Sequence, residues 1–535
     1  MRAPGTFLAF ILLTLITIAS QAQTGQLDGS NDNRSLGDIA RERRAAHKVE
    51  IKVTQEDSKK LFSSIGEVVD FASDDTGFPK RREVKHQLVS QEDVKRHMSE
   101  AMNESAAAQR LARSELVLKK FGFLPRDFDL KTFLVGASGQ SIAGYYDFKT
   151  KTMCLLNWIA LDQQMPIMAH ELTHALQDQN YDLQVWHHQD KQSKSRQAQA
   201  KLAVDAEDEQ EDEARTAVVE GQAMVVYVDY TLKPLGRRLT NSPDLVQVLK
   251  GRLEGSYDTA VVVHNAPFML KESALFPYRE GLNFELELLK KGGTQLAFAG
   301  AFARPPRDTH EILQPEVYLE HEKQAPVLIP DLRTALPAEF EAYDSGTIGE
   351  LDVRIFARQF GRDNDVYVLG QNWRGGSYVA VKRAANPPEA KASTSDLGLL
   401  YVSRWKTRES AERFIQLYKA SLAKRTTVQG EKTFEPTTCA GPGQDCGPRW
   451  SARVNTDEGP VFIELWPGNL VFISHTFDEQ TVGRLRQTVL KPGSRPAASS
   501  TAELSLRLYD LPAFRAFQDE VWREMSRNIA QLSRR

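Results

Sequence analysis

Hydrophobic positions recur every three to four residues from Val49 to about Phe121, a period that places apolar side chains on one face of a helix. We therefore expect helices there. The same spacing predicts a buried helix over 214–230 and largely helical chain over 240–320. Within the last stretch, Asp308 is followed three residues later by Glu311, which fits a capping box at a helix start.

The period changes to two between these helical stretches. Three short runs rich in β-branched and aromatic residues, 132–135, 141–146 and 152–158, predict strands. Residues 147–151 then form the hairpin turn between the last two. A helix follows, with Pro166 in its first turn, where the missing N–H of proline is tolerated.

The second half of the chain has a mixed pattern typical of a separate α+β domain. A linker rich in Pro, Ala and acidic residues covers about 322–345. Beyond it, period-two and helical runs predict the following order: strands 365–370, 378–382 and 399–405, helix 408–422, strands 461–466 and 470–475, and helix 479–490. A Pro/Ser/Ala linker, 492–501, and a terminal helix, 504–532, complete the chain.

The first 22 residues have the pattern of a secretory signal peptide. Arg2 precedes an apolar run of about a dozen residues, Phe7 to Ile18, and small residues lead to a cleavage site after Ala22. The run is too short for the ~20 residues of a transmembrane helix, and no later stretch is long and uncharged enough. We expect a secreted or periplasmic protein without an integral membrane segment, and a flexible polar leader over 23–48.

The composition narrows the class of protein. The 535 residues include 68 Lys and Arg against 71 Asp and Glu, a net charge of −3, so no overall basic field favours nucleic acid as a partner. With 41% hydrophobic and 26% charged residues, the chain can bury an ordinary globular core. We expect an α+β fold with a mainly helical domain over 49–335, an accessory domain over 346–491, and a linker with a terminal helix over 492–535.

The sequence His170-Glu171-Leu172-Thr173-His174 carries the chemistry. From the residue frequencies, an H-E-x-x-H arises by chance with a probability of roughly 0.02 in a chain of this length. On a helix, residues four apart lie 40° from each other, so both imidazoles share a face and can bind one ion. Glu171 lies near the same edge, where a general base is needed.

Two histidines leave a zinc site incomplete, so we searched for a third ligand. The extended H-E-x-x-H-x-x-G-x-x-H motif is excluded, because Gln177 and Asn180 occupy the positions of its Gly and last His. Glu220 is a carboxylate on the apolar stripe of the helix 214–230, and a buried carboxylate needs a partner or a metal. Glu213, two turns earlier, competes for this role. Gly221 permits another element to approach closely.

This arrangement of motifs resembles the gluzincin group of zinc metallopeptidases, of which thermolysin is the familiar member. The likeness is closer to a family of secreted prokaryotic proteins and covers about residues 50–320. A weaker likeness continues in QNWRGG (371–376). The motifs that carry the closer likeness stand, in order, as AGYYDFKTKTMCLLNW (143–158), PIMAHELTHALQDQ (166–179), ARTAVVEGQA (214–223), FPYREG (276–281) and PPRDTHEILQPEVYL (305–319).

The resemblance implies a zincin-like domain with a small β-sheet, a Zn²⁺ cofactor and a peptide or protein substrate. Three protein ligands leave the fourth place for water, and Glu171 then serves as the general base. In the resembled fold an edge strand pairs with the substrate, and the strand 152–158 is the candidate here. Asp178 is a candidate acceptor for the second ring N–H of a ligand histidine. Tyr278, Arg279 and His310 are alternative transition-state stabilisers.

Other chemistries are weaker. Cys439 and Cys446 are spaced for a disulfide in an exported loop, and Cys154, which departs from the family pattern, is expected to be a buried strand residue. The acidic run 205–213 is interpreted as a solvated segment, with a calcium site as the alternative. For the whole protein, the rival to a hydrolase is a zinc-stabilised surface or binding protein, and a hydrolase acting on another bond also stays open.

Overall fold

The computed structural model places its helices and strands in a defined set of residues, and the description below is confined to them. All belong to one unit, Lys52–Arg535. The described residues are 55–90, 92–93, 105–137, 144–156, 161–188, 208–242, 266–322, 327–383, 393–435 and 447–490, with the single helical positions 514, 517, 518, 521, 522, 525, 526 and 529.

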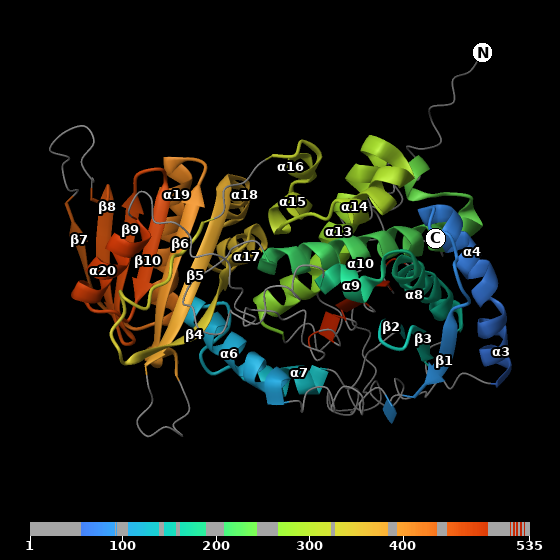
Figure 1. Cartoon of the computed structure of the whole chain (residues 1–535), viewed down its shortest axis with the longest axis horizontal. Coiled ribbons are helices and arrows are strands. Elements are labelled where there is room, and N and C mark those ends of the chain that lie inside the picture. The colour runs from blue at the N-terminus through green and yellow to red at the C-terminus, as the bar shows by residue number, and fades with distance from the viewer. Residues whose placement is uncertain are drawn as a thin grey trace, which may run out of the picture. The chain divides into compact units, whose positions relative to one another are not determined.

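The protein is an α+β structure, as the sequence predicts, with two sheets and helices between and around them (Figure 1). The N-terminal region is largely helical but also contributes one strand that the helical spacing did not predict. Its elements are α3 (Gln55–Ser63), α4 (Ile65–Thr76), β1 (Lys85–Val89), α6 (Ser105–Phe121) and α7 (Leu130–Ala137).

A three-stranded sheet lies beside these helices in the order β1-β3-β2. β2 (Gly144–Asp147) and β3 (Thr152–Leu156) form the antiparallel hairpin that the pattern predicts, and β1 pairs with β3 in parallel. The expectation that the strand 152–158 is an edge strand is wrong. β3 is central among the described strands, because β1 supplies the backbone groups that pair with its second edge.

Long helices form the rest of this half. They are α8 (Leu161–Tyr181), α9 (Leu183–His188), α10 (Asp208–Leu232), η3 (Lys233–Leu235), η4 (Leu239–Asn241), α13 (Phe268–Thr294), the π-helix η6 (Gln295–Gly300), α14 (Ala301–Ala303), α15 (Thr309–Leu313) and α16 (Pro315–Leu319). The predicted helices over 214–230 and in the described part of 240–320 are confirmed. The Asp308 carboxylate caps α15 by accepting from the Glu311 N–H, whereas the Glu311 carboxylate accepts from the Arg307 N–H instead of completing a capping box.

α10 and α13 pack at backbone distance, which brings two elements of the site together. A Cβ atom added to Gly221 on α10 would lie 2.4 Å from the Gly281 carbonyl, and one added to Gly281 would lie 2.1 Å from the Ala217 oxygen. Only hydrogen fits at these positions. The close approach expected at Gly221 is confirmed, and Gly281 in the FPYREG motif is its partner.

The second sheet is antiparallel and has seven strands in the order β4-β5-β6-β10-β9-β8-β7. α17, α18 and η7 also belong to this region, and α19 and α20 lie on opposite faces of the sheet. The bounds are β4 (Phe340–Thr347), α17 (Glu350–Phe360), α18 (Asp363–Asn372), β5 (Trp373–Arg383), η7 (Thr394–Asp396), β6 (Leu397–Trp405), α19 (Arg408–Arg425), β7 (Val428–Phe434), β8 (Trp450–Thr456), β9 (Gly459–Trp466), β10 (Leu470–His475) and α20 (Glu479–Val489).

Both faces of the inner strands of this sheet, β5, β6, β10 and β9, are buried, so their alternating side chains enter two cores. On β6, Tyr401 belongs to the large core that continues into α8 and α10, while Leu400 and Val402 belong to a smaller core beneath α20. Phe121 of α6 packs edge-on against Tyr401, with ring centroids 5.8 Å apart. The large core therefore extends from the sheet to the helices around the H-E-x-x-H sequence.

Four predictions of local structure are wrong. Residues 132–135 lie in α7 and 365–370 in α18, although both runs are rich in strand-forming side chains. The predicted linker 322–345 contributes strand β4 and buried apolar residues from 327 onward. Pro166 lies well inside α8 instead of in its first turn, so the helix begins earlier than its proline suggests.

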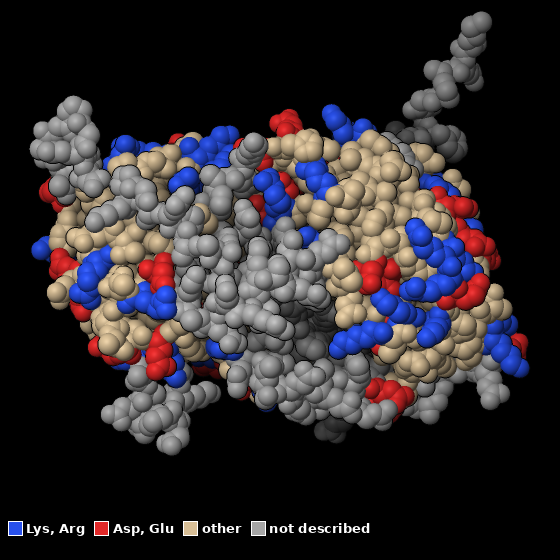
Figure 2. Space-filling view, viewed as in Figure 1, with Lys and Arg blue, Asp and Glu red and all other residues tan. Residues whose placement is uncertain are grey.

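Lys and Arg alternate with Asp and Glu over the visible described residues, without a large region of one sign (Figure 2). Among the described helices, none combines the length and apolar character needed to cross a bilayer. The signal peptide with its cleavage after Ala22, the leader 23–48, Cys439 and Cys446, and the linker 492–501 lie outside the described residues.

Candidate metal centre

Helix α8 positions both histidines because its apolar residues are buried on all sides. Met168, Leu172 and Ala175 are fully buried, so this part of α8 lies in the core and the polar side chains between them are shielded from bulk water. His170 and His174 are 2% and 4% exposed. One turn of helix separates them, and their rings are perpendicular with centroids 4.7 Å apart.

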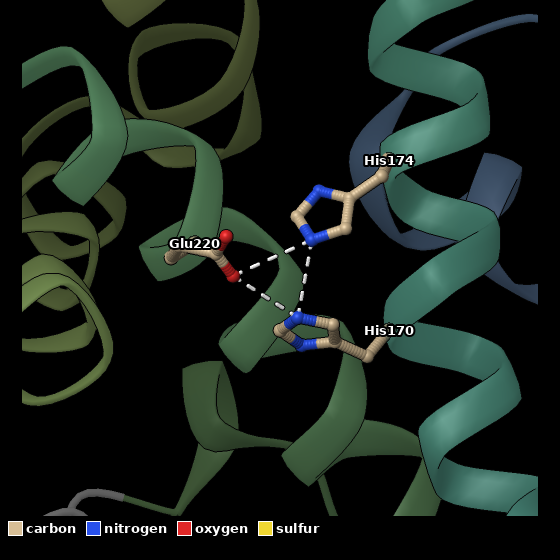
Figure 3. Close-up of side chains that lie close together, drawn as sticks. All are labelled: His170, His174 and Glu220. Atoms are coloured by element: carbon tan, nitrogen blue, oxygen red, sulfur yellow. Dashed lines mark hydrogen bonds and ion pairs between the residues drawn. The ribbon is translucent and has the colours of Figure 1, made fainter. Parts of the chain in front are cut away.

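Helix α10 supplies a carboxylate to the same point. Glu220 projects from it toward α8, and the three side chains point toward one another (Figure 3). The Glu220 Oε2 atom lies 3.1 Å from His170 Nε2 and 3.4 Å from His174 Nε2, while the two Nε2 atoms are 3.1 Å apart. Among the described residues, this is the group of His, Cys, Asp and Glu side chains whose atoms lie close enough to share an ion.

These distances fit a zinc ion. A tetrahedral zinc with bonds of about 2.0–2.1 Å separates its ligand atoms by about 3.3 Å, close to all three edges of this triangle. Two imidazoles and one carboxylate are also a donor set that zinc binds in hydrolases. The residues present therefore fit the group that the sequence suggests, with Glu220 and not Glu213 beside the histidines.

A chain of amide side chains fixes the tautomer of His174. Gln177 Nε2 donates to the Val219 carbonyl, 3.0 Å away, and to Gln222 Oε1, so its oxygen must face His174 Nδ1 at 2.8 Å. His174 therefore carries its proton on Nδ1 and leaves the Nε2 lone pair for a metal. Gln222 Nε2 continues the chain by donating to two carbonyls of the π-helix η6, Ala297 and Phe298.

Glu171 lies at the edge of this cluster and is 4% exposed. The backbone N–H of Tyr146, on β2, donates to its carboxylate. Gly144 of the same strand permits the approach, since a Cβ atom there would lie 3.3 Å from Ile167 Cγ2 and 3.7 Å from Glu171 Cγ. Burial raises the pKa of Glu171, against the opposing effect of the two histidines. A carboxylate with a raised pKa suits proton transfer near neutral pH.

The charges of the cluster favour a cation at its centre. Burial disfavours the charged form of His174, but Glu220 and Glu171 outweigh this effect and raise the pKa of His174 to about 9. Burial likewise opposes ionisation of Glu220, yet the two histidines hold its pKa well below the usual range. The protein ligands by themselves thus stabilise one positive charge at the point where their atoms converge.

The three candidate stabilisers of the transition state lie in different surroundings. Tyr278, on α13, is near the cluster, with its ring centroid 6.4 Å from that of His170. Arg279 turns to Glu272 and Glu280, at 3.1 and 2.7 Å. His310 binds Glu350 in a separate buried cluster, described below. Of the three, the structure brings Tyr278 to the histidines.

Asp178 does not accept from a ligand histidine, contrary to expectation. Its carboxylate accepts from the Tyr146 hydroxyl at 3.0 Å and from Lys151 Nζ at 2.7 Å, so it ties the β2–β3 hairpin to α8. Gln177, its neighbour, takes the predicted role instead. Cys154 is buried in β3, as expected, and its sulfur accepts from Gln87 Nε2.

Sequence analysis did not predict four residues of the site: Gln177, Gln222, Tyr227 and Trp522. The two glutamines lie on helices that the pattern predicts, and both are fully buried. Because a buried amide needs hydrogen-bond partners, their burial is the signal that identifies them. Trp522 belongs to the C-terminal helix and stacks on His170, with ring centroids 4.6 Å apart. No spacing in the sequence connects it with a residue 352 positions earlier.

Comparisons with protein-family models, curated proteins and solved structures gave no match to this chain. The function is therefore inferred from the geometry of the site.

Proposed function

We propose that this protein is a zinc-dependent metallohydrolase of the gluzincin type, most readily a peptidase. The observation that carries the proposal is the triangle of His170 Nε2, His174 Nε2 and Glu220 Oε2, with edges that match tetrahedral zinc. Glu171, adjacent on α8, adds an acid–base group that a purely structural zinc site does not need.

His170, His174 and Glu220 would hold the ion, which supplies a water of lowered pKa and polarises the substrate carbonyl. The chain's own groups perform the proton transfers. Glu171 takes a proton from the attacking water and returns it to the leaving amine. The N–H of Tyr146 orients the Glu171 carboxylate, and Gln177 holds the His174 ring in the tautomer that binds metal.

A peptide substrate is favoured by the strand next to Glu171. β2 is an edge of the three-stranded sheet as described, and it lies against α8. An extended peptide can pair with an exposed strand edge through main-chain hydrogen bonds. We therefore assign the predicted substrate-pairing role to β2 in place of β3. The zincin-like fold of this half, and export after cleavage at Ala22, belong to the same proposal.

The test combines metal content with hydrolysis. The purified mature protein should contain about one zinc per chain by elemental analysis and should cleave peptides from a mixed fluorogenic library. Glu171→Gln should keep the zinc and lose at least about a hundredfold in kcat, because the general base is removed without altering the ligands. Asp178→Asn, on the same helix but bonded to the hairpin, is the matched control for the fold.

Two results would overturn the proposal. If the protein binds no zinc when it is supplied, the site is not a metal centre. If hydrolysis survives Glu171→Gln unchanged, the activity belongs to another group. Zinc bound at one per chain with no hydrolysis of peptides, esters or amides would instead support the rival function, a zinc-stabilised binding protein.

A further inference from the structure

The C-terminal helix lies on the candidate metal centre. Its described positions recur at spacings of three and four, and every one is buried, so the helix buries a continuous face. These residues are Phe514, Phe517, Gln518, Val521, Trp522, Met525, Ser526 and Ile529. Figure 1 draws this helix as short red pieces next to the green helices. In the sequence, it is far from the residues that it contacts.

Trp522 is the side chain of this helix that contacts the site. Its indole stacks on the His170 ring at a tilt of 27°, with centroids 4.6 Å apart, and on the Tyr278 ring at a tilt of 13°, 5.4 Å away. Tyr227 of α10 meets it edge-on at 4.8 Å. Because Nε2 belongs to the His170 ring, the indole lies next to the atoms that bind the metal.

A hydrogen bond and a second aromatic contact attach the helix. The Tyr227 hydroxyl donates to the backbone oxygen of Ser526 at 2.9 Å, and Phe517 packs on Phe133 of α7 at 5.5 Å. The attachment is incomplete at its centre, because the Trp522 indole N–H is buried without a partner among the described residues. Burying an unpaired donor weakens docking by an amount comparable to a lost hydrogen bond.

The cover leaves little access for a substrate, since among His170, Glu171, His174 and Glu220 only the Glu220 side chain is appreciably exposed, at 19%. His170, Glu171 and His174 are each less than 5% exposed, whereas a peptide must bring its carbonyl carbon next to Glu171. The rings that flank Trp522, those of His170, Tyr227 and Tyr278, form a slot of the shape that accepts a planar aromatic side chain.

From these contacts we propose that the C-terminal helix is an intramolecular inhibitor, with Trp522 in a subsite that accepts an aromatic side chain of the substrate. The inference rests on the proposed metal site and extends it to regulation and substrate class. The helix and a peptide with a bulky aromatic residue compete for the same slot. The site opens when the helix leaves it, either because the helix binds elsewhere or because cleavage of the chain releases it.

The test follows the metal, so that it does not depend on hydrolysis. The full-length protein loaded with zinc is mixed with a chromophoric chelator, and the rate of zinc release is measured. Trp522→Ala should accelerate release at least tenfold, because the cover over His170 is lost. Tyr227→Phe, which removes the hydroxyl that donates to Ser526, should accelerate it about threefold. Trp522→Phe should stay near the wild-type rate.

A synthetic peptide supplies the second measurement. The sequence 511–532 added to the Trp522→Ala protein should restore slow release, whereas the same peptide with Ala at 522 should not. Short peptides with Trp or Phe should protect the zinc better than their Ala analogues. Trp450→Ala, on β8 of the seven-stranded sheet, controls for the loss of a tryptophan and should leave the rate unchanged.

The outcomes separate this inference from the proposed function. Faster release in Trp522→Ala and Tyr227→Phe, with rescue by the peptide, supports the inhibitor even if no variant hydrolyses a peptide, in which case the peptidase proposal alone falls. Equal rates in wild type and Tyr227→Phe, with no effect of the peptide, overturn the inhibitor. If Trp522→Ala does not fold, the comparison of zinc release between Tyr227→Phe and the wild type decides the matter.

Discussion

The protein contains two buried clusters in which histidine meets glutamate, and they differ in their charges. At the candidate metal centre, Glu220 faces the Nε2 atoms of His170 and His174, and these rings are its contacts within the described residues. In the second cluster, one oxygen of Glu350 on α17 binds His310 Nδ1, and the other accepts from Arg354 Nε and Nη2 at 2.7 and 2.6 Å.

The second cluster contains its own counter-charge. Arg354 neutralises Glu350, and Gln314 Nε2 donates to the same carboxylate at 2.7 Å. This ion pair holds α15 against α17, although His310 Nε2 is buried without a partner among the described residues. At the metal centre two ring nitrogens converge on one carboxylate oxygen, which leaves a concentration of lone pairs for a cation. Proximity of His and Glu is therefore insufficient to identify a metal site. The second cluster differs from the candidate metal centre because it contains a permanent cation, Arg354.

The largest expected effect tests this distinction directly. Glu220→Gln keeps the shape of the side chain but removes its charge. If structural zinc sites bind with about 10–16 kcal/mol, one lost ligand costs about 4 kcal/mol, or roughly a thousandfold in affinity. Competition with a chelator of known affinity measures this. Glu213→Gln, two turns earlier on α10, should bind zinc as the wild type does, and equal losses in both variants would contradict the assignment.

The second cluster should respond in the opposite way. Glu350→Gln leaves Arg354 and His310 without their counter-charge, so we expect the free energy of unfolding to fall by about 3 kcal/mol, near the lower limit for buried pairs because Arg354 is partly exposed. Zinc affinity should not change. Urea unfolding measures the change in the free energy of unfolding, and the same chelator competition measures the zinc affinity. Loss of zinc in this variant would show that the clusters are coupled.

The same contrast explains which parts of the structure the sequence predicts. His170, His174 and Glu220 were predicted as ligands because a helical repeat has a fixed angle, and they lie together in the structure. The rotation of α8 about its own axis, which decides which side chains face its neighbours, is not fixed by the helical repeat. Gln177 and Asp178 differ by 100° on the helix, and packing alone decides that Gln177 reaches His174 while Asp178 reaches Tyr146.

Helix capping and packing also override the local propensity of some residues to form strands. Residues 132–135 have strand-forming side chains, but the Asp129 carboxylate accepts from the Thr132 N–H, and Leu130 and Leu134 bury one helical face. In α18 the bond runs the other way, because the Asp365 carboxylate in the first turn accepts from the backbone N–H of the N-cap residue, Arg362. These caps start helices in runs that propensity assigns to strands. The four inner strands of the seven-stranded sheet, β5, β6, β10 and β9, were predicted because both their faces are buried and their apolar runs are long, whereas β4, β7 and β8 toward its edges were not.

A smaller effect on zinc affinity is expected when Gln177, which supports His174, is replaced. Gln177→Leu preserves volume but removes the acceptor that fixes the Nδ1 tautomer, so zinc affinity should fall by about ten- to a hundredfold. Gln179→Leu is the matched control, since Gln179 lies on the same helix but accepts from the backbone of Arg81 and Arg82. An unchanged zinc affinity in Gln177→Leu would mean that the amide chain only stabilises the fold.

A third buried acidic site, on the same helix as Glu220, sharpens the contrast between neutralised and unneutralised carboxylates. Burial raises the pKa of Asp229 to about 8, and the neighbouring Asp75 adds to the effect, while the Leu239 N–H and Arg238 oppose it. Without a converging pair of histidines or a fully buried cation, this carboxyl group keeps its proton instead of binding a metal.

The raised pKa makes stability depend on pH in a defined direction. An unfolded aspartate loses its proton near pH 4, whereas folded Asp229 holds its proton up to about pH 8. Between these values the folded state binds more protons, so stability is greatest at the acidic end and falls as pH rises, by at most about 1.4 kcal/mol per pH unit. Above pH 8 both states are ionised and the dependence ends.

Asp229→Asn should flatten this dependence, because the amide still accepts from the Leu239 N–H but cannot ionise. Urea unfolding at pH 5 to 8, with the metal removed by a chelator so that zinc binding does not contribute, measures the slope. Asp70→Asn on the exposed face of α4 should keep the wild-type slope. A variant at Asp229 that still loses stability steeply toward pH 8 would place the titrating proton on Asp75 instead.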